Sequence, residues 1–219
     1  METRRQQFTS AFLIVSVGLT CGILGLAFTR AGGSRAIPPL SHYGHLPDFS
    51  LIDHHQHPFS QATLAGSVWI ADFIFTRCAG QCPLMSAQMA ALHQALRDLP
   101  AIRFVSFSVD PVYDTPARLA AYASHYEIPD DRWRLVTESD APVLPPVREA
   151  SPITTIAHLA HDGFRLGVGA DGPPEEPITH SVRLVLVDQH GSIRGYYDAT
   201  DVQAMAQLQA DVRRLARER

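Results

Sequence analysis

The sequence predicts a single α/β domain with a mixed sheet flanked by helices. The first observation is a nearly continuous apolar run at Val68–Phe75, which suits a central strand buried on both faces. The second is an apolar stripe of helical spacing directly after that run. The third is the order of patterns along the chain: strand, helix, strand, helix, strand, irregular insert, hairpin and helix. A length of 219 residues favours one domain with a short appendage.

Composition excludes several classes of protein. Hydrophobic residues make up 46% of the chain and charged residues 18%, which is ordinary for a chain that buries a real core. The formal net charge of -4 argues against a nucleic-acid partner, because such a partner calls for a basic face. Three cysteines are too few for a disulfide scaffold. Cys78 and Cys82 lie close together, whereas Cys21 lies in an apolar segment and is most simply a small apolar residue.

That apolar segment, Ala11–Phe28, predicts a membrane anchor. It carries no charge, and its length is near the lower limit for spanning a bilayer. We expect an uncleaved anchor, with the globular part outside the cytoplasm. A cleaved signal peptide is the alternative, since the small residues at 31–34 suit a cleavage site. The predicted organisation is a short tail, a transmembrane anchor, a linker and a domain, at residues 1–10, 11–29, 30–45 and 46–219 in turn.

A weak hairpin opens the domain, with Phe49–Asp53 and Pro58–Ser60 as its strands. Five histidines lie in this hairpin or shortly before it: His42, His45, His54, His55 and His57. Such a cluster can bind a metal ion. The simpler interpretation, which we favour, is a solvated turn with incidental histidines.

The helix after the central strand has Pro83 in its first turn and is predicted to end at Pro100. Its apolar stripe consists of Met85, Met89, Leu92, Leu96 and Leu99. At this spacing we interpret the methionines as core residues rather than as soft metal ligands.

The remaining elements follow from similar patterns. Further strands are predicted at Ala101–Val109, Trp133–Val136, Val182–Asp188 and Ser192–Tyr197, the last two as a hairpin. One helix is predicted to start at Asp114, a cap beside Thr115, and a closing helix at Thr200, which resembles a capping box with Gln203. Residues 138–177 form the irregular insert, with one helical piece around Ile153–Ala160.

The chemistry is expected at Cys78 and Cys82, where the central strand meets the helix. A helix N-terminus favours the thiolate, the form that attacks disulfides and binds metals. Helical residues four apart have Cβ atoms roughly 5–6 Å apart, whereas a disulfide needs about 3.5–4.5 Å. The first cysteine must therefore lie off the helix if the pair is to oxidise readily, and a looser pair suits an ion. His180, at the entry to a strand, is a candidate third ligand, and such a set suits Cu(I), or zinc with an open position.

Three other functions remain open at this point. A thiol–disulfide reductase needs both cysteines but not His180. A peroxidase related to thioredoxin is less favoured, because metal binding better accounts for the cysteine spacing together with a distal histidine. A structural zinc site is also less favoured, since such sites usually have four protein ligands and no fourth cysteine exists.

The runs VWIADFIFTRCAGQCPLM, SFSVDPVYDTPARLAAYA and ITHSVRLVLVDQHGSIRGYYD resemble the SCO/SenC family, in the same order and over about Leu46 to Asp198. The resemblance implies a thioredoxin-like, membrane-anchored copper-binding protein that assists assembly of cytochrome c oxidase. It implies that Cys78, Cys82 and His180 bind one copper ion, as Cu(I) or also as Cu(II). The irregular insert would carry the histidine towards the cysteines.

The implied partners are the copper-receiving subunit of cytochrome c oxidase and, through residues 11–29, the inner (cytoplasmic) membrane. The chain would cross this membrane once, with its domain on the periplasmic or extracytoplasmic side. Two positions depart from the family pattern: Ala79, where many members have proline, and Thr179, where many have an acidic residue. Three further residues in family-like motifs are expected to have structural roles only: Asp110, Asp114 and Arg194.

Overall fold

The computed structural model describes residues 38–78, 80–129, 132–138, 156–169 and 179–218. The chain divides into two units, Met1–Pro39 and Leu40–Arg219, and every element described below belongs to the second. The predicted tail and anchor, residues 1–29, lie outside the described residues. Within the described ranges, no helix is long and apolar enough to cross a bilayer.

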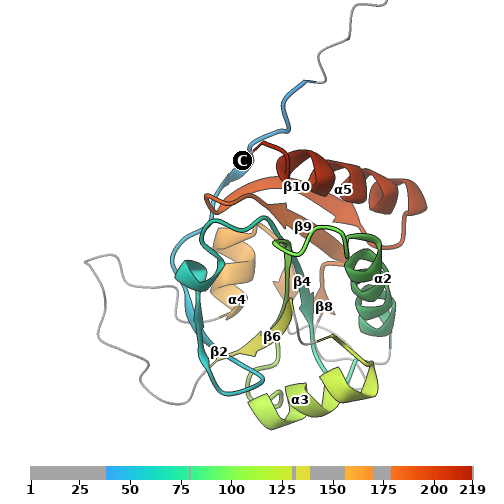
Figure 1. Cartoon of the computed structure of the whole chain (residues 1–219). Helices are drawn as coiled ribbons and strands as arrows, with labels where there is room; N and C mark the ends of the chain where they lie inside the picture. Colours follow the sequence, from blue (N-terminus) through green and yellow to red (C-terminus); the bar gives the residue numbers. More distant parts are fainter. Residues whose placement is uncertain (1–37, 79, 130–131, 139–155, 170–178, 219) are drawn as a thin grey trace, which may run out of the picture. The chain divides into compact units, whose positions relative to one another are not determined.

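The second unit is built on one mixed sheet, as predicted (Figure 1). Across the sheet the strand order is β1-β10-β9-β4-β5-β6-β2-β3. The strands are β1 (Gly44–His45), β2 (Ser50–Asp53), β3 (Pro58–Ser60), β4 (Trp69–Ile74), β5 (Arg103–Ser108), β6 (Trp133–Thr137), β9 (Arg183–Val187) and β10 (Ser192–Asp198). A separate two-stranded sheet pairs β7 (Val168–Gly169) with β8 (Thr179–His180).

The centre of the large sheet is parallel and its two edges are antiparallel. β4 pairs in parallel with β5, and β5 with β6, whereas β9 runs antiparallel to β4. Every residue of β4 is buried, as expected for a continuous apolar strand covered on both faces. Because parallel strands end at the same edge, the segments after β4 and β5 lie together at the end of the sheet that carries the cysteines.

Helices cover the sheet, and connect its strands. They are α2 (Gln81–Ala95), α3 (Pro116–His125), the short α4 (Ile156–His158) with a π turn at Leu159–Gly163, and α5 (Val202–Leu215). In Figure 1, α2 and α5 lie on one side of the sheet and α4 on the other. The helical piece predicted at Ile153–Ala160 is therefore present from Ile156, and its first three residues lie outside the described residues.

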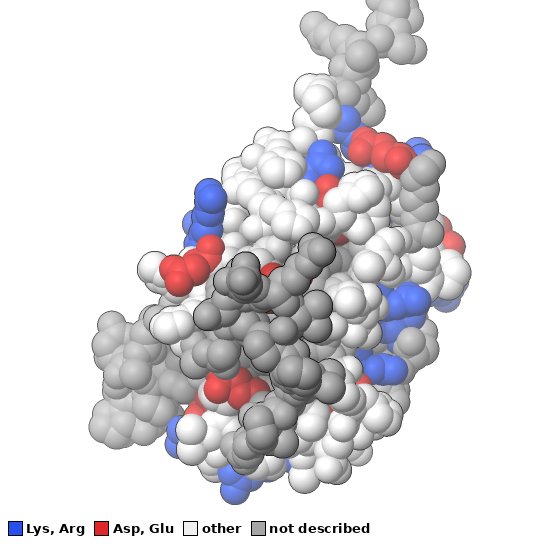
Figure 2. Space-filling view, turned by 90° about the vertical axis from the view of Figure 1, so that its left-hand side faces the viewer, with Lys and Arg blue, Asp and Glu red and all other residues white. Residues whose placement is uncertain are grey.

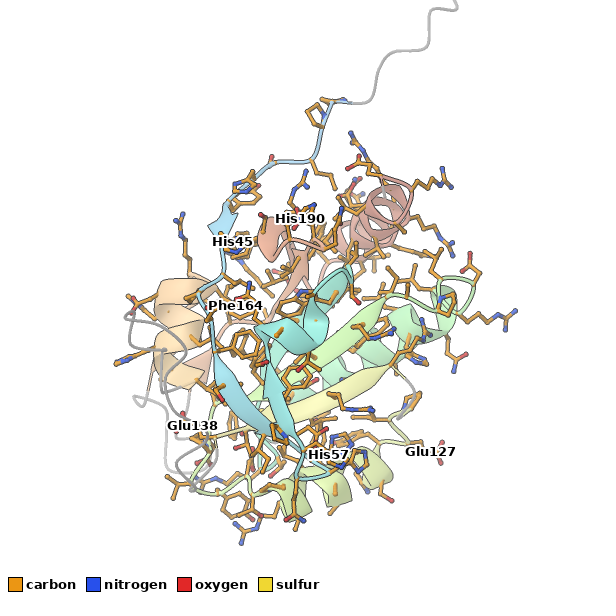
Figure 3. All side chains as sticks on the ribbon, turned by 60° about the vertical axis from the view of Figure 1, so that its left-hand side comes forward. His45, His57, Glu127, Glu138, Phe164 and His190 are labelled. Carbon is orange, nitrogen blue, oxygen red and sulfur yellow. The ribbon has the colours of Figure 1, made fainter. Side chains whose placement is uncertain are left out.

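An aromatic cluster fills the α4 side of the core. Phe164, which follows the π turn, points toward the sheet in Figure 3 and packs against Trp69, Phe73 and Phe107. The Phe73 and Phe107 rings, on paired positions of β4 and β5, stack with their centroids 5.2 Å apart. Because strand residues alternate in direction, Asp72 faces the other side of the sheet.

Three helix ends differ from the prediction. Helix α2 ends at Ala95 with Leu96 as its C-cap, four residues before Pro100 is reached, because the chain turns there to enter β5. The cap of α3 is Thr115, whose hydroxyl accepts from the N–H of Arg118, and not Asp114. The cap of α5 is Asp201, whose carboxylate accepts from the N–H of Gln203. Thr200 instead donates its hydroxyl to Asp198.

The compact unit also includes the end of the segment predicted as a linker. β1 pairs with β10, and the ring of Tyr43 packs edge-on against Tyr196. Arg194 donates to the carbonyls of Leu40 and Ser41, and its guanidinium forms an ion pair with Asp188. Residues 40–45 are thus held to the outer edge of the sheet.

The surface carries both signs of charge. Figure 2 shows one face, on which the described acidic and basic side chains are interspersed. All 18 basic residues of the sequence are arginines, so their charge does not change over the ordinary pH range.

Candidate metal centre

The two cysteines lie at the junction between β4 and α2. Cys78 is half-buried in the loop before the helix, and Cys82 is fully buried in the first turn. Both cysteines are reduced in the described structure, and the backbone N–H of Cys82 donates to the sulfur of Cys78 over 3.5 Å. Cys78 therefore lies off the helix, the arrangement that the sequence requires for a pair that oxidises readily.

Burial controls the acidity of the inner thiol. It raises the pKa of Cys82, and the nearby Cys78 and Asp72 raise that pKa further because they disfavour a second negative charge. A helix N-terminus was expected to favour the thiolate, but at Cys82 burial outweighs that effect. Cys82 is therefore a thiol in the metal-free protein at neutral pH, and a metal ion that binds its sulfur must displace a proton.

A buried carboxylate fixes the loop before Cys78. Asp114 is fully buried and accepts hydrogen bonds from the backbone N–H and the hydroxyl of Thr76. It also accepts from the hydroxyl of Ser108, at the end of β5. Sequence reasoning missed this role and assigned Asp114 to a helix cap, because a cap and a buried acceptor look alike beside Thr115 and Pro116.

A second carboxylate holds the residue next to Cys78. Arg77 donates its Nε to Asp110 over 2.8 Å, and the terminal nitrogen lies 2.7 Å from the same oxygen. Asp110 was expected only to end its strand. The sequence does contain a signal for this role. Arg77 directly precedes the first cysteine, and Asp110 follows the next predicted strand, so the two would meet if these strands pair in parallel.

Asp72 is a buried acid on the opposite face of β4 from Phe73. Neither of its oxygens has a hydrogen-bond partner among the described residues, and burial raises its pKa to about 7, against a smaller lowering by the nearby Ser106 hydroxyl. Its charge affects the pKa values of both Cys82 and Tyr122, so it lies beneath the cysteine end of α2. The sequence analysis gave this residue no role.

The structure places the backbone of His180 in β8, where it pairs with Val168 of β7. Ser181, the next residue, donates to the carbonyl of Gly167 just before that strand. The side chain of His180 lies outside the described part of the structure, so its role as a ligand stays a prediction. Among the described side chains, no group of three or more His, Cys, Asp or Glu residues is arranged to hold a metal ion.

The five N-terminal histidines do not form one site. His45 and His57, both labelled in Figure 3, lie well apart, the first in the upper half of the molecule and the second near its lower end. His54 is buried, and its ring nitrogen lies 3.3 Å from both the backbone N–H and the carbonyl of Leu135. Asp53 accepts from the N–H groups of His55 and His57 and so shapes the turn. The favoured interpretation was a solvated turn with incidental histidines, and it fits the exposed His55 and His57 but not the buried His54.

The donor set of the pair fits a soft metal ion. Thiolate sulfur prefers Cu(I), zinc and iron–sulfur chemistry over hard cations. One sulfur is accessible and the other is buried, so a metal ion between them would be half-shielded from water. Two protein sulfurs leave room for a third ligand.

These features define a thioredoxin-like thiol protein, in which a central strand ends in a loop with one cysteine and the next helix begins with another. The chain belongs to the SCO1/SenC family, whose sequence profile matches residues 40–133. The resemblance noted in the sequence is thereby confirmed.

Two relatives and one solved structure show the extent of the similarity. The "SCO1 protein homolog" of Bacillus subtilis (strain 168) is 36% identical over 121 residues, which are 55% of this chain and 62% of the relative, less than two thirds of its length. The "Putative copper-binding protein" of Stutzerimonas stutzeri is 30% identical over 70% of this chain and 69% of its own length. The structure of BsSco, described with a disulfide switch as a member of the Sco family of cytochrome c oxidase assembly proteins, matches with a TM-score of 0.67 and 26% identity, over 82% of this chain and 98% of BsSco.

Proposed function

We propose that this protein binds one copper ion through Cys78, Cys82 and His180, and delivers it to cytochrome c oxidase or prepares the oxidase copper site. The observation that carries the proposal is the contact of the Cys82 N–H with the Cys78 sulfur, which holds two reduced cysteines together at the end of the central strand. The names of two similar proteins, the "Putative copper-binding protein" and a member of a family of cytochrome c oxidase assembly proteins, support the choice of copper and of the partner.

The asymmetry of the pair suits transfer rather than storage. The half-buried Cys78 sulfur can meet an incoming thiolate, whereas the buried Cys82 sulfur keeps the ion until the exchange is complete. The imidazole of His180 would complete a three-ligand site. The proposal includes an anchor at residues 11–29 in the inner membrane, with the domain on the extracytoplasmic side.

Copper binding is tested by loading the purified, reduced chain with Cu(I) and measuring its metal content and affinity against a competing chelator. We expect about one Cu(I) per chain, and a loss of affinity of roughly 100-fold, about 2.8 kcal/mol, in His180→Ala. His161→Ala is the matched control, because that histidine is exposed and bonds only with the neighbouring Asp162 in the described structure. Equal affinity of His180→Ala and the parent would contradict the three-ligand site.

A second candidate function is thiol–disulfide exchange with the cysteines of the partner. Two reduced cysteines, with an N–H of one donating to the sulfur of the other, favour it, and the disulfide switch named for BsSco is consistent with it. This activity needs both sulfurs but no imidazole. Reduction of a partner disulfide that persists in His180→Ala and is lost in Cys78→Ser would support it, whereas loss in both variants would favour copper binding as the main role.

A further inference from the structure

Exposed apolar side chains gather beside the cysteine loop. Among the described residues, the large hydrophobic side chains exposed to solvent are Tyr43, Leu84, Val112, Tyr113 and Val202. Val112 and Tyr113 lie in the loop between β5 and α3, and Leu84 lies in the first turn of α2, two residues after Cys82. Single exposed hydrophobic residues are normal on a protein surface. Three of these five lie either just after the cysteines or in the loop that Arg77 contacts, and this grouping needs a local explanation.

Contacts with arginines hold this loop to the residue before Cys78. The guanidinium of Arg77 lies 4.8 Å from the ring centre of Tyr113, and that of Arg118 lies 3.8 Å from it. Arg118 also donates to the carbonyl of Tyr113 over 2.7 Å. The Arg77–Asp110 ion pair ties the same loop to the cysteine segment. The apolar side chains are thus presented on a fixed surface, not on a loose loop.

The charged groups of Arg77 and Arg118 are exposed on this surface. The carboxylate of Asp110 forms an ion pair with Arg77. Among the described residues, no carboxylate forms an ion pair with Arg118, which contacts Tyr113 instead. Two guanidinium groups are therefore exposed on this surface, whereas the two carboxylates beneath the same loop, Asp110 and Asp114, are buried. We call the surface formed by Arg77, Leu84, Val112, Tyr113 and Arg118 the docking face.

We propose that the docking face binds a protein that carries carboxylates and a small apolar contact around its metal-accepting thiols. The apolar side chains supply contact area, and the two guanidiniums select an acidic partner, since arginine matches carboxylates in geometry and charge. The inference rests on the proposed function, because it assigns the docking face to the exchange at Cys78. The Val112 side chain is 93% exposed, so it gains the most from being covered.

The exchange itself is a ligand substitution. A thiolate of the partner forms a bond to Cu(I) as the bond from the Cys78 sulfur breaks. A second partner thiolate then displaces the Cys82 sulfur, and the neutral imidazole of His180 leaves the ion as the exchange is completed. The protons lost by the partner thiols are balanced by those that the two cysteines regain. Copper remains Cu(I), so no oxidant or reductant is needed.

A pair of synthetic peptides tests the docking face. Both contain a Cys-x3-Cys acceptor, flanked in one by glutamates and in the other by lysines. At low salt, we expect Cu(I) transfer from the loaded chain to the glutamate peptide to be roughly tenfold faster than to the lysine peptide. Arg118→Glu should abolish or invert this preference, and Val112→Asp should reduce it without disturbing any packed side chain. Arg217→Glu is the control, since Arg217 is an exposed arginine after the end of α5.

Two outcomes are distinguishable. If Arg118→Glu and Val112→Asp behave like Arg217→Glu while all variants still carry one copper ion, the docking face is wrong and copper binding stands. If the chain takes up no copper, the same two peptides with serine in place of cysteine are titrated into the reduced chain and followed by NMR. Preferential binding of the glutamate peptide that is lost in Arg118→Glu supports the docking face, and equal binding of both peptides overturns it.

Discussion

The buried carboxylate of Asp114 accepts hydrogen bonds from both the backbone N–H and the hydroxyl of Thr76, two residues before Cys78. Ser108, at the end of the neighbouring strand, donates to the same carboxylate. One side chain thus joins the ends of β4 and β5 beneath the cysteine loop. The position of Cys78 depends on a residue that is distant in sequence and touches neither sulfur in the described contacts.

Removal of this carboxylate should loosen the loop. In Asp114→Ala the three donors lose their acceptor inside the protein, and we expect the free energy of unfolding to fall by roughly 2–4 kcal/mol. Urea denaturation of the reduced chain measures this. Asp162→Ala, an exposed carboxylate beside His161, should change the value by less than about 0.5 kcal/mol. A similar small change in Asp114→Ala would show that the loop does not depend on these hydrogen bonds.

Asp72 should make stability depend on pH near neutrality. Its pKa is raised to about 7 by burial, so between about pH 4 and 7 the folded state binds a proton that the unfolded state does not. Stability must therefore fall as the pH rises through this range and then level off. Asp72→Asn, which mimics the protonated acid, should gain stability relative to the parent between pH 5 and pH 8, by up to roughly 3 kcal/mol, because about two of the three pH units between the unfolded and folded pKa values lie above pH 5.

Thermal unfolding at several pH values checks this expectation. The difference in Tm between Asp72→Asn and the parent should grow from pH 5 to pH 8. Asp162→Asn provides a control at an exposed position and should give a constant difference. A parallel course for Asp72→Asn and the parent would mean that Asp72 ionises in the folded protein near its usual pKa.

The order and type of the elements could be predicted because the periodicity of the apolar residues determines them. The run at Val68–Phe75 became the fully buried β4, and the two-strand pattern near residues 182–197 became the β9–β10 hairpin. Helix ends were less predictable. Asp114 and Thr200 both look like caps in sequence, but each side chain has a different partner that only the fold brings near.

The site could be predicted in part, for a related reason. The cysteines are four residues apart, so sequence alone places them together at a strand-to-helix junction. Asp110 and Asp114 lie more than 30 residues after Thr76 and Arg77, and they meet the cysteine loop only because β4 and β5 pair in parallel. The burial of Cys82 and Asp72 likewise depends on the packing around α2, which local patterns do not describe.

The two thiols should react at different rates. Cys78 is half-buried and Cys82 is fully buried with a raised pKa, so an alkylating reagent should modify Cys78 first. With limiting iodoacetamide at pH 7.5, we expect at least roughly tenfold more label at Cys78, measured by mass spectrometry of the digested chain. In urea the two rates should converge, since both thiols are then exposed. Faster labelling of Cys82 in the folded chain would contradict the placement of the two sulfurs.

Arg194 should hold residues 40–45 against the sheet. Its guanidinium joins the carbonyls of Leu40 and Ser41 to the carboxylate of Asp188, which also accepts from the N–H of Ser192. Arg194→Ala removes all three contacts, and amide hydrogen exchange in residues 40–45 should accelerate by roughly tenfold or more at pH 7. Arg183→Ala is the control, because that exposed arginine on the neighbouring strand makes no contact with the segment in the described structure.

The pH dependence of this effect identifies the ion pair as its source. Burial alone would raise the pKa of Asp188, but the N–H of Ser192 and the guanidinium of Arg194 lower it below its usual value. A carboxyl whose pKa is lowered by folding stabilises the folded state at pH values above its pKa in the unfolded chain. This contribution is lost as the pH falls through its pKa in the folded protein. The difference in exchange between Arg194→Ala and the parent, corrected for intrinsic exchange rates, should therefore be largest near neutral pH and shrink in acid, as the pH falls below the usual carboxyl pKa and through the lowered pKa of Asp188. A difference that persists unchanged in acid would mean that the carbonyl contacts of Arg194, and not its pairing with Asp188, hold the segment.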